Sequence, residues 1–208
     1  MTSSMCARRL VILLGTVVVG LTLTACGTSK PAQFYTLTPE TFGADEAVAA
    51  AAFAYSVAVG PVSLPEAVNR PQFVVKDGPN RVVVLESHRW VEPLKSGIAE
   101  AVAGFLSRDL NGARVTPMTQ SAANEAQFDV ALDVQHFEMV VGDAVSIEVV
   151  WTIKRRDASS EPMLGRSIAR EAAQTSGDAY DALVAAQVRA LASISGDIAQ
   201  HLTQAAPR

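Results

Sequence analysis

The fold of this chain is decided by the stretch FDVALDVQ, residues 128–135, in which apolar residues alternate with small or polar ones. Successive side chains of a β-strand point to opposite faces of a sheet, so the alternation predicts a strand with one buried and one solvated face. The pair His136-Phe137 breaks the alternation and predicts a β-bulge, and Gly142-Asp143 predicts a turn. The alternation returns over residues 145–154, which predicts a second strand of the same sheet.

The C-terminal part of the chain is expected to add one strand and one helix. The strand is predicted over residues 164–174, and the helix begins near Asp178, with Ser176 or Asp178 as its N-cap. Apolar residues recur in this helix at three- and four-residue steps, and they form a stripe long enough to cover a sheet. The stripe consists of Tyr180, Val184, Val188, Leu191, Ile194, Ile198 and Leu202.

A second amphipathic helix is expected upstream of residues 128–135. It opens within residues 87–94, carries Pro93 in its first turn and runs to about Leu110. Its apolar stripe consists of Leu94, Ile98, Val102, Phe105, Leu106 and Leu110. Further short strands are expected over residues 56–62, 72–75, 81–85 and 113–116. These elements predict an α+β fold, a two-layer sandwich in which a mostly antiparallel mixed sheet carries two amphipathic helices on one face.

Three features of the N-terminus occur together. Arg8 and Arg9 precede an apolar run over residues 10–23, which is too short to span a bilayer. The run ends in Leu23-Thr24-Ala25-Cys26, where a small residue directly precedes the cysteine. This pattern favours a lipoprotein signal peptide that is cleaved before Cys26, whose thiol and amine then carry acyl chains. An ordinary cleaved signal peptide with a chance cysteine, or an uncleaved anchor, is the alternative.

The chain is expected to have three parts, of which the first is removed by cleavage. Residues 1–25 form the signal peptide, and residues 26–55 hold the lipidated cysteine, a polar tether, the first strand and an Ala-rich linker. Residues 56–208 form a single α+β domain, whose sheet residues 34–38 are expected to join. The residue after the cysteine is Gly27, whereas Asp is the usual signal for inner-membrane retention in enterobacteria. We therefore expect a lipid-anchored protein on the periplasmic leaflet of the outer membrane.

The composition excludes several classes of function. Of the two cysteines, Cys6 is removed with the signal peptide and Cys26 is consumed by lipid, so neither a disulfide nor a Cys-based site is expected. The formal net charge is −4, and no basic block is present, which argues against a nucleic-acid partner.

The sequence contains few of the residue patterns that are typical of a catalytic or metal site. His88, His136 and His201 are far apart, and none has the second ligand at three or four residues that a metal pair needs. Nucleophile elbows, phosphate-binding loops and zinc-protease motifs are lacking from the sequence, so no enzyme activity, cofactor or metal is expected. Asp129 and Asp133 are better explained as a solvated sheet face, with Lys154 or Arg170 nearby.

Four residues are candidates for binding a partner: Arg70, Arg89, Trp90 and Glu92. Tryptophan and arginine are the residue types most enriched at interaction hot spots. The structural alternative is that Trp90 caps the apolar stripe of the adjacent helix, while Arg89 and Glu92 pair locally. Trp151, in the middle of an alternating strand, is expected in the core.

The chain resembles the PqiC/YmbA-type auxiliary lipoproteins of ABC transport, also called membrane integrity-associated transporter subunits. The resemblance spans roughly residues 23–110, and the remainder matches in architecture. It rests on the following motifs in the order of the family: Leu23-Thr24-Ala25-Cys26, Phe34-Tyr35-Thr36-Leu37, Val59-Gly60-Pro61-Val62, Leu64-Pro65, Asn69-Arg70-Pro71-Gln72 and Arg89-Trp90-Val91-Glu92-Pro93-Leu94.

The resemblance implies a non-catalytic component of an intermembrane lipid transport system. Its implied partners are a mammalian-cell-entry (MCE) domain protein and the inner-membrane permease complex of that protein. The lipoprotein would dock the periplasmic MCE assembly at the outer membrane, and whether it forms a homo-oligomeric ring stays open. A periplasm-facing lipid carrier with an apolar cavity, and an envelope hydrolase, are the alternatives.

Overall fold

The computed structural model describes residues 31–37, 54–110, 112–157, 161–173 and 177–205. The signal peptide, Cys26, most of the tether, the Ala-rich linker up to residue 53 and Ser176 lie outside the described residues. Residues Ala32–Arg208 form one compact unit, which contains all the elements below.

The larger of two sheets has five strands in the order β5-β2-β6-β7-β8. Its strands are β2 (Tyr55–Ser63), β5 (Ala113–Pro117), β6 (Phe128–Met139), β7 (Ala144–Arg155) and β8 (Met163–Ala172). The strand β2 runs parallel to β5 and β6, whereas β6, β7 and β8 form an antiparallel meander. The predicted alternation along β6 is confirmed, and its register slips by one residue between Val134 and His136, at the predicted bulge.

The smaller sheet has three strands in the order β1-β4-β3. β1 (Gln33–Tyr35) runs parallel to β4 (Val82–Trp90), and β3 (Gln72–Lys76) runs antiparallel to it. Two contacts join this sheet to the end of β6. Lys76 forms an isolated bridge with Val140, and its Nζ lies 2.7 Å from Glu138 Oε2.

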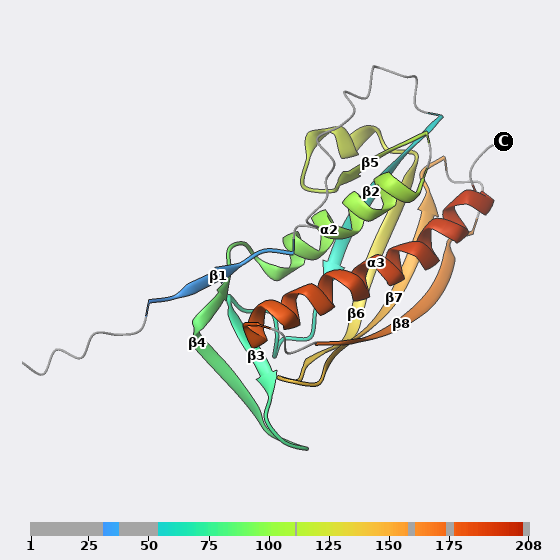
Figure 1. Cartoon of the computed structure of the whole chain (residues 1–208). Coiled ribbons are helices and arrows are strands. Elements are labelled where there is room, and N and C mark those ends of the chain that lie inside the picture. Colours follow the sequence, from blue (N-terminus) through green and yellow to red (C-terminus); the bar gives the residue numbers. More distant parts are fainter. Residues whose placement is uncertain (1–30, 38–53, 111, 158–160, 174–176, 206–208) are drawn as a thin grey trace, which may run out of the picture. The chain divides into compact units, whose positions relative to one another are not determined.

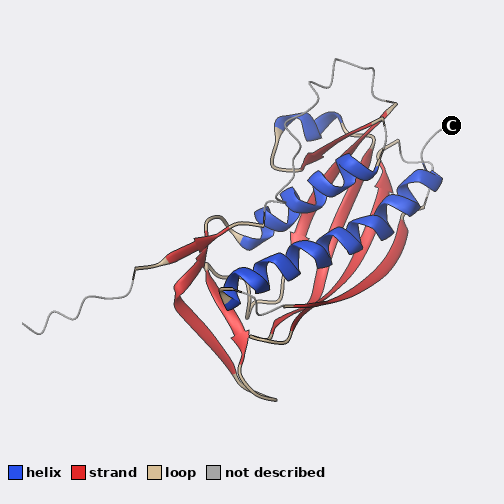
Figure 2. Ribbon diagram, in the orientation of Figure 1, coloured by secondary structure: helices blue, strands red, loops and turns tan. Residues whose placement is uncertain are grey.

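Two helices, α2 (Leu94–Asp109) and α3 (Ala179–Ala205), lie side by side on one face of the larger sheet (Figure 1, Figure 2). α2 packs over β2 and β5, and α3 packs over β7 and β8, so the core lies between the helices and the sheet. The predicted stripe of α2 is buried throughout, and that of α3 is buried or partly buried. The α+β sandwich is therefore confirmed.

The start of α3 also agrees with its sequence. Asp178 Oδ1 accepts the N–H groups of Tyr180 and Asp181 at 2.8 and 3.3 Å, which satisfies two backbone donors of the first turn. By length and composition α3 is apolar enough to cross a membrane, but half of its most apolar window is buried within the fold. Such burial is typical of a core helix.

The strands form two sheets, where the sequence predicted one. Residues 87–90, which were predicted to open α2, belong instead to β4, where they pair with β1 and β3. The helix begins only at Leu94, with Pro93 as its N-cap residue. Proline disfavours a helical conformation in the residue before it, so Glu92 cannot continue a helix into Pro93.

The end of β2 also differs from the prediction. A turn was expected at Gly60-Pro61, but the strand continues to Ser63 and absorbs these residues as an irregularity in its pairing with β6. Gly60 has a φ angle of +132°, which residues with a side chain rarely adopt, so glycine suits this irregular position.

Trp151 fills the core between β8 and α3, as its place in the alternating strand predicts. It is 2% exposed, its Nε1 donates to Ser167 Oγ at 3.1 Å, and its ring centroid lies 4.7 Å from that of His201. Its register partner on β8 is Gly165. A Cβ at Gly165 would lie 2.0 Å from Trp151 Cζ2, so the indole fits here because residue 165 is a glycine.

The opposite face of the larger sheet is solvated, as predicted, and carries polar side chains together with the exposed Leu164 and Ile168 of β8. Asp129 pairs with Arg156 at 2.6 Å, rather than with the expected Lys154, which is its register partner on β7. Arg170 pairs with Asp143 at 2.9 Å. Asp133 accepts hydrogen bonds from neutral side chains, among them Gln135 Nε2 at 2.6 Å.

An aromatic group, here called the junction cluster, holds the smaller sheet against the start of α3. Ring centroids lie 4.7 Å apart for Tyr35 and Phe73, 4.4 Å for Phe73 and Trp90, and 3.9 Å for His88 and Tyr180. The hydroxyl of Tyr35 is hydrogen-bonded to His88 Nδ1 at 2.9 Å. Burial, followed by the negative charges of the α3 N-terminus, raises the pKa of Tyr35 to about 12.

We predict that Gly165→Ala destabilises the domain by about 1–3 kcal/mol, because the added methyl group overpacks the site of Trp151. The measurement is the free energy of unfolding in urea. The matched control is Gly196→Ala in α3, where a Cβ meets nothing within 4 Å and the higher helix propensity of alanine should add stability. Equal effects of the two substitutions would contradict the packing of Trp151 described above.

A second prediction concerns the pH dependence of stability. The pKa of Tyr35 is about 12 in the folded state and 10.0 in the reference state, so the folded state binds more protons between these values. The free energy of unfolding should therefore fall as the pH rises from 10 to 12. In Tyr35→Phe this contribution is missing, and the stability difference from wild type should shrink over that range in denaturant titrations. A difference that stays constant would rule out the proposed environment of Tyr35.

Candidate docking site

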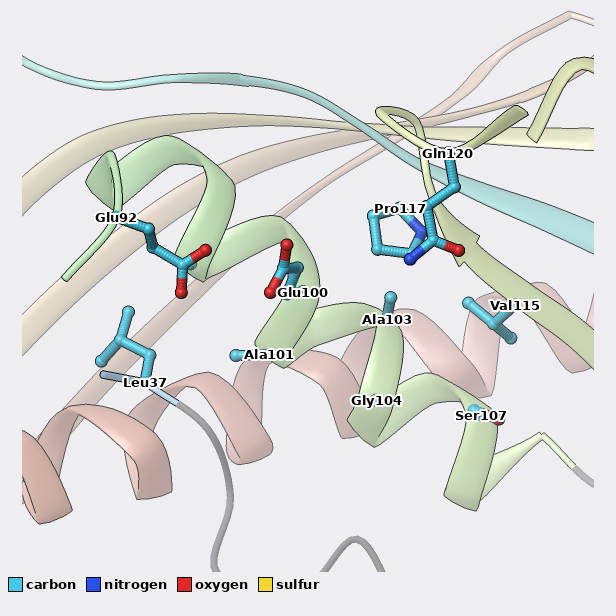
Figure 3. Close-up of a pocket in the computed structure, with 11 residues that line it drawn as sticks. Leu37, Glu92, Glu100, Ala101, Ala103, Gly104, Ser107, Val115, Pro117 and Gln120 are labelled. Carbon is cyan, nitrogen blue, oxygen red and sulfur yellow. The ribbon is translucent and has the colours of Figure 1, made fainter. Parts of the chain in front are cut away.

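Residues 90–94 link β4 to α2, and a pocket opens on each side of this link. The first, here called the Arg70 pocket, has a volume of about 350 Å³ and opens between the link and the loop before β3. The second, here called the Glu100 pocket, has a volume of about 370 Å³ and opens between α2 and β5 (Figure 3).

The Arg70 pocket has an apolar floor and a cationic rim. Trp90 contributes to its floor and is 5% exposed, because its ring packs on Phe73. The backbone fixes the opposite wall, since the Trp90 N–H donates to Pro71 O at 2.8 Å. Arg70 is exposed at the rim, and it forms no ion pair with any residue that the structure describes. A guanidinium that stays hydrated above an apolar floor is available to a partner.

The structure brings three of the four predicted docking residues to this pocket. Arg70, Trp90 and Glu92 all line it, although Arg70 is twenty residues from Trp90 in the chain. Trp90 is 5% exposed and belongs to the hydrophobic core, and it also lines the pocket. Arg89 lies on the other face of β4, where Phe34 is its register partner, and it does not line the pocket. Local pairing of Arg89 with Glu92 is absent among the described ion pairs.

The Glu100 pocket was not predicted from the sequence. Figure 3 shows Glu92, from the link, and Glu100, from α2, facing it, with Pro117 and Gln120 on the opposite side. Burial, followed by repulsion from Glu100, raises the pKa of Glu92 above its ordinary value. Glu92 lines both pockets, and its carboxylate lies over the first turn of α2, next to Gly97.

Small residues make room for the Glu100 pocket. Gly97, Ala101 and Gly104 recur on α2 at steps of four and three residues, so one face of the helix has almost no side chains. That spacing is visible in the sequence and is the pattern that would have located this surface. In the described part of the chain, no group of three or more His, Cys, Asp or Glu residues is placed to hold a metal ion.

Comparison with solved structures supports the fold. One structure, described only as that of an uncharacterised protein, has a TM-score of 0.65 and 17% sequence identity, and the match covers 83% of this chain and 99% of that one. A protein from Xanthomonas campestris, assigned to the DUF330 family, has a TM-score of 0.51 and 18% identity, with 70% of this chain and 81% of that one covered. No curated protein matches the sequence.

A family model matches residues 35–199, which is most of the chain and includes α2, most of α3 and the strands β2 to β8. The description of that model is "ABC-type transport auxiliary lipoprotein component". The match extends the resemblance seen in the N-terminal motifs through the meander and into α3. The chain therefore belongs to the family of ABC-type transport auxiliary lipoprotein components.

Proposed function

We propose that this protein is a non-catalytic lipoprotein that docks the periplasmic part of an MCE-type lipid transport system at the outer membrane. Acyl chains on Cys26 hold it on the periplasmic leaflet, and the Arg70 pocket receives the MCE-domain protein or another subunit of the same permease complex. Membership of a family of auxiliary transport lipoproteins supports the general role. The location, the MCE partner and the docking residues are the proposed refinements.

The observation that carries the docking proposal is the Arg70 pocket. Its floor is already formed by Trp90 and Leu94, which are buried by their own domain, so a partner side chain would enter a preorganised apolar site. Arg70 at the rim has no competing ion pair within the described structure and is available for a carboxylate of the partner. Tryptophan and arginine, which both line this pocket, are among the residue types most enriched at interaction hot spots.

The three predicted residues that line the Arg70 pocket would have different roles in docking. Arg70 would contact the partner directly, whereas Trp90 would act through the shape of the floor. Glu92 would act from the wall between the two pockets, where partial burial already disfavours its charged form. Substitution of Arg70 therefore tests docking most directly, since Trp90 cannot be removed without damage to the core.

We predict that Arg70→Glu weakens capture of the purified MCE-domain protein of the same bacterium by at least tenfold. Charge reversal removes a favourable pair and adds repulsion to an acidic partner group. The measurement is the dissociation constant by biolayer interferometry with the lipidated protein in detergent. The fold should be unaffected because the side chain is exposed, and an unchanged melting temperature verifies this.

The matched control is Lys154→Glu, which changes the net charge by the same amount on the exposed face of β7. This variant should bind as wild type. If both variants lose binding equally, the effect is one of net charge, and the Arg70 pocket is not the docking site. If wild type itself does not bind, the MCE partner is wrong.

A second prediction concerns the anchor. In cells fed radiolabelled palmitate, the wild-type protein should become labelled, and mass spectrometry should find an acylated cysteine at its N-terminus. Cys26→Ser should remain unlabelled, because the hydroxyl group does not replace the thiol on which the acyl chains are carried. An unlabelled wild-type protein that retains its initiator methionine would refute the lipoprotein anchor.

A further inference from the structure

Two large apolar side chains are exposed next to the point where the tether enters the domain. Phe34 of β1 is 61% exposed, and Val91, directly after β4, is 65% exposed. Phe34 is the register partner of Arg89, and the Val91 N–H donates to Tyr35 O at 2.9 Å, so that the parallel ladder continues past the end of β4. Alternate residues of a strand share a face, so Arg89 and its register partner Phe34 lie on the face of the smaller sheet opposite to Tyr35 and Trp90. Phe34 and the exposed Val91, which directly follows β4, are here called the outer-face pair.

The inner face of the same strands is fully engaged. Tyr35, which follows Phe34, and Trp90, which lies between Arg89 and Val91, belong to the junction cluster and pack on Phe73. The rigid inner face therefore fixes the position of the outer-face pair, Phe34 and Val91, relative to α2 and α3. Figure 1 shows β1 at the end of the domain where α3 begins, away from the C-terminal end of that helix.

The length of the tether restricts which part of the domain lies near the membrane. Seven residue steps separate Cys26 from Gln33, and a fully extended chain of that length spans at most about 25 Å. The helix α3 has 27 residues and is therefore about 40 Å long. An acylated Cys26 keeps β1 close to the lipid surface, whereas the far end of α3 is further from β1 than the tether is long.

We propose that the outer-face pair, Phe34 and Val91, inserts into the lipid surface that anchors Cys26. This inference rests on the lipidation that the proposed function assumes. An aromatic ring enters the boundary between headgroups and acyl chains. The contact would fix the orientation of the domain on the membrane, so that the Arg70 pocket, which Val91 also lines, opens beside the lipid surface.

A lipid surface suits this pair better than a protein does. A stable protein interface buries about 800 Å² on each partner, far more than two side chains supply. A tethered contact needs little affinity of its own, because the tether raises the effective concentration of lipid at the pair. Phe34 and Val91 are therefore sufficient for orientation once Cys26 provides the attachment.

The test is tryptophan quenching by brominated lipid. Phe34→Trp is prepared as the full lipidated protein and reconstituted into vesicles of brominated phosphatidylcholine, with unbrominated vesicles as the reference. The two native tryptophans, Trp90 and Trp151, are 5% and 2% exposed and give the background. We expect Phe34→Trp to lose a clearly larger fraction of its fluorescence than wild type does.

The matched control is Ile168→Trp, which places a tryptophan at a position 63% exposed on the outer face of β8. It should be quenched no more than the wild-type background. Equal quenching at positions 34 and 168, or none at 34 in protein whose acylation has been verified by mass, would overturn the inference while leaving the anchor intact. Absence of acylation would instead refute the proposed function.

A further variant separates lipid from a protein partner. Phe34→Glu should leave capture of the MCE-domain protein in detergent unchanged, because Phe34 does not line the Arg70 pocket. If Phe34→Glu abolishes that capture and Phe34→Trp is not quenched, the outer face of β1 is a protein docking surface and the lipid contact is wrong.

Discussion

The packing of the junction cluster is the interaction on which the rest of the molecule depends. The smaller sheet has three strands and little core of its own, and β1 contributes only three residues to it. Stacking of Tyr35, Phe73 and Trp90 with one another, and of His88 with Tyr180, joins this sheet to the start of α3. The Arg70 pocket, through Trp90, and the entry of the tether, through Tyr35, both adjoin that junction, so their mutual geometry is only as rigid as these ring contacts.

The sequence predicted the parts of the fold that are governed by local periodicity. The meander of β6, β7 and β8, its bulge and the stripe of α2 were all recovered, because a half-buried strand or helix shows its buried face in the spacing of apolar residues. The division into two sheets was not recovered. Parallel pairing of β2 with β5 and β6 joins segments distant in sequence, and no local pattern records which strands pair.

The candidate site shows the same limit. Residues 87–90 were assigned to a helix because they precede one, yet their conformation is set by pairing with β1 and β3. Trp90 is therefore held in the core from one side and forms a pocket floor on the other, an outcome that lies between the two alternatives the sequence offered. Gly97, Ala101 and Gly104 form no apolar or charged pattern, so the Glu100 pocket is visible in the sequence only through their regular spacing on α2.

Rigidity at the junction matters because docking depends on the direction in which the Arg70 pocket opens. An anchored domain that turned freely would present the Arg70 pocket in all directions, and a partner spanning the periplasm would meet it in few of them. A lipid contact by Phe34 and Val91 would restrict the rotation of the domain on the membrane. The junction cluster would transmit this restriction through β4 to residues 90–94 and the start of α2. Anchor, lipid contact and docking pocket would then act as one unit because they share β4, whose inner and outer faces serve different neighbours.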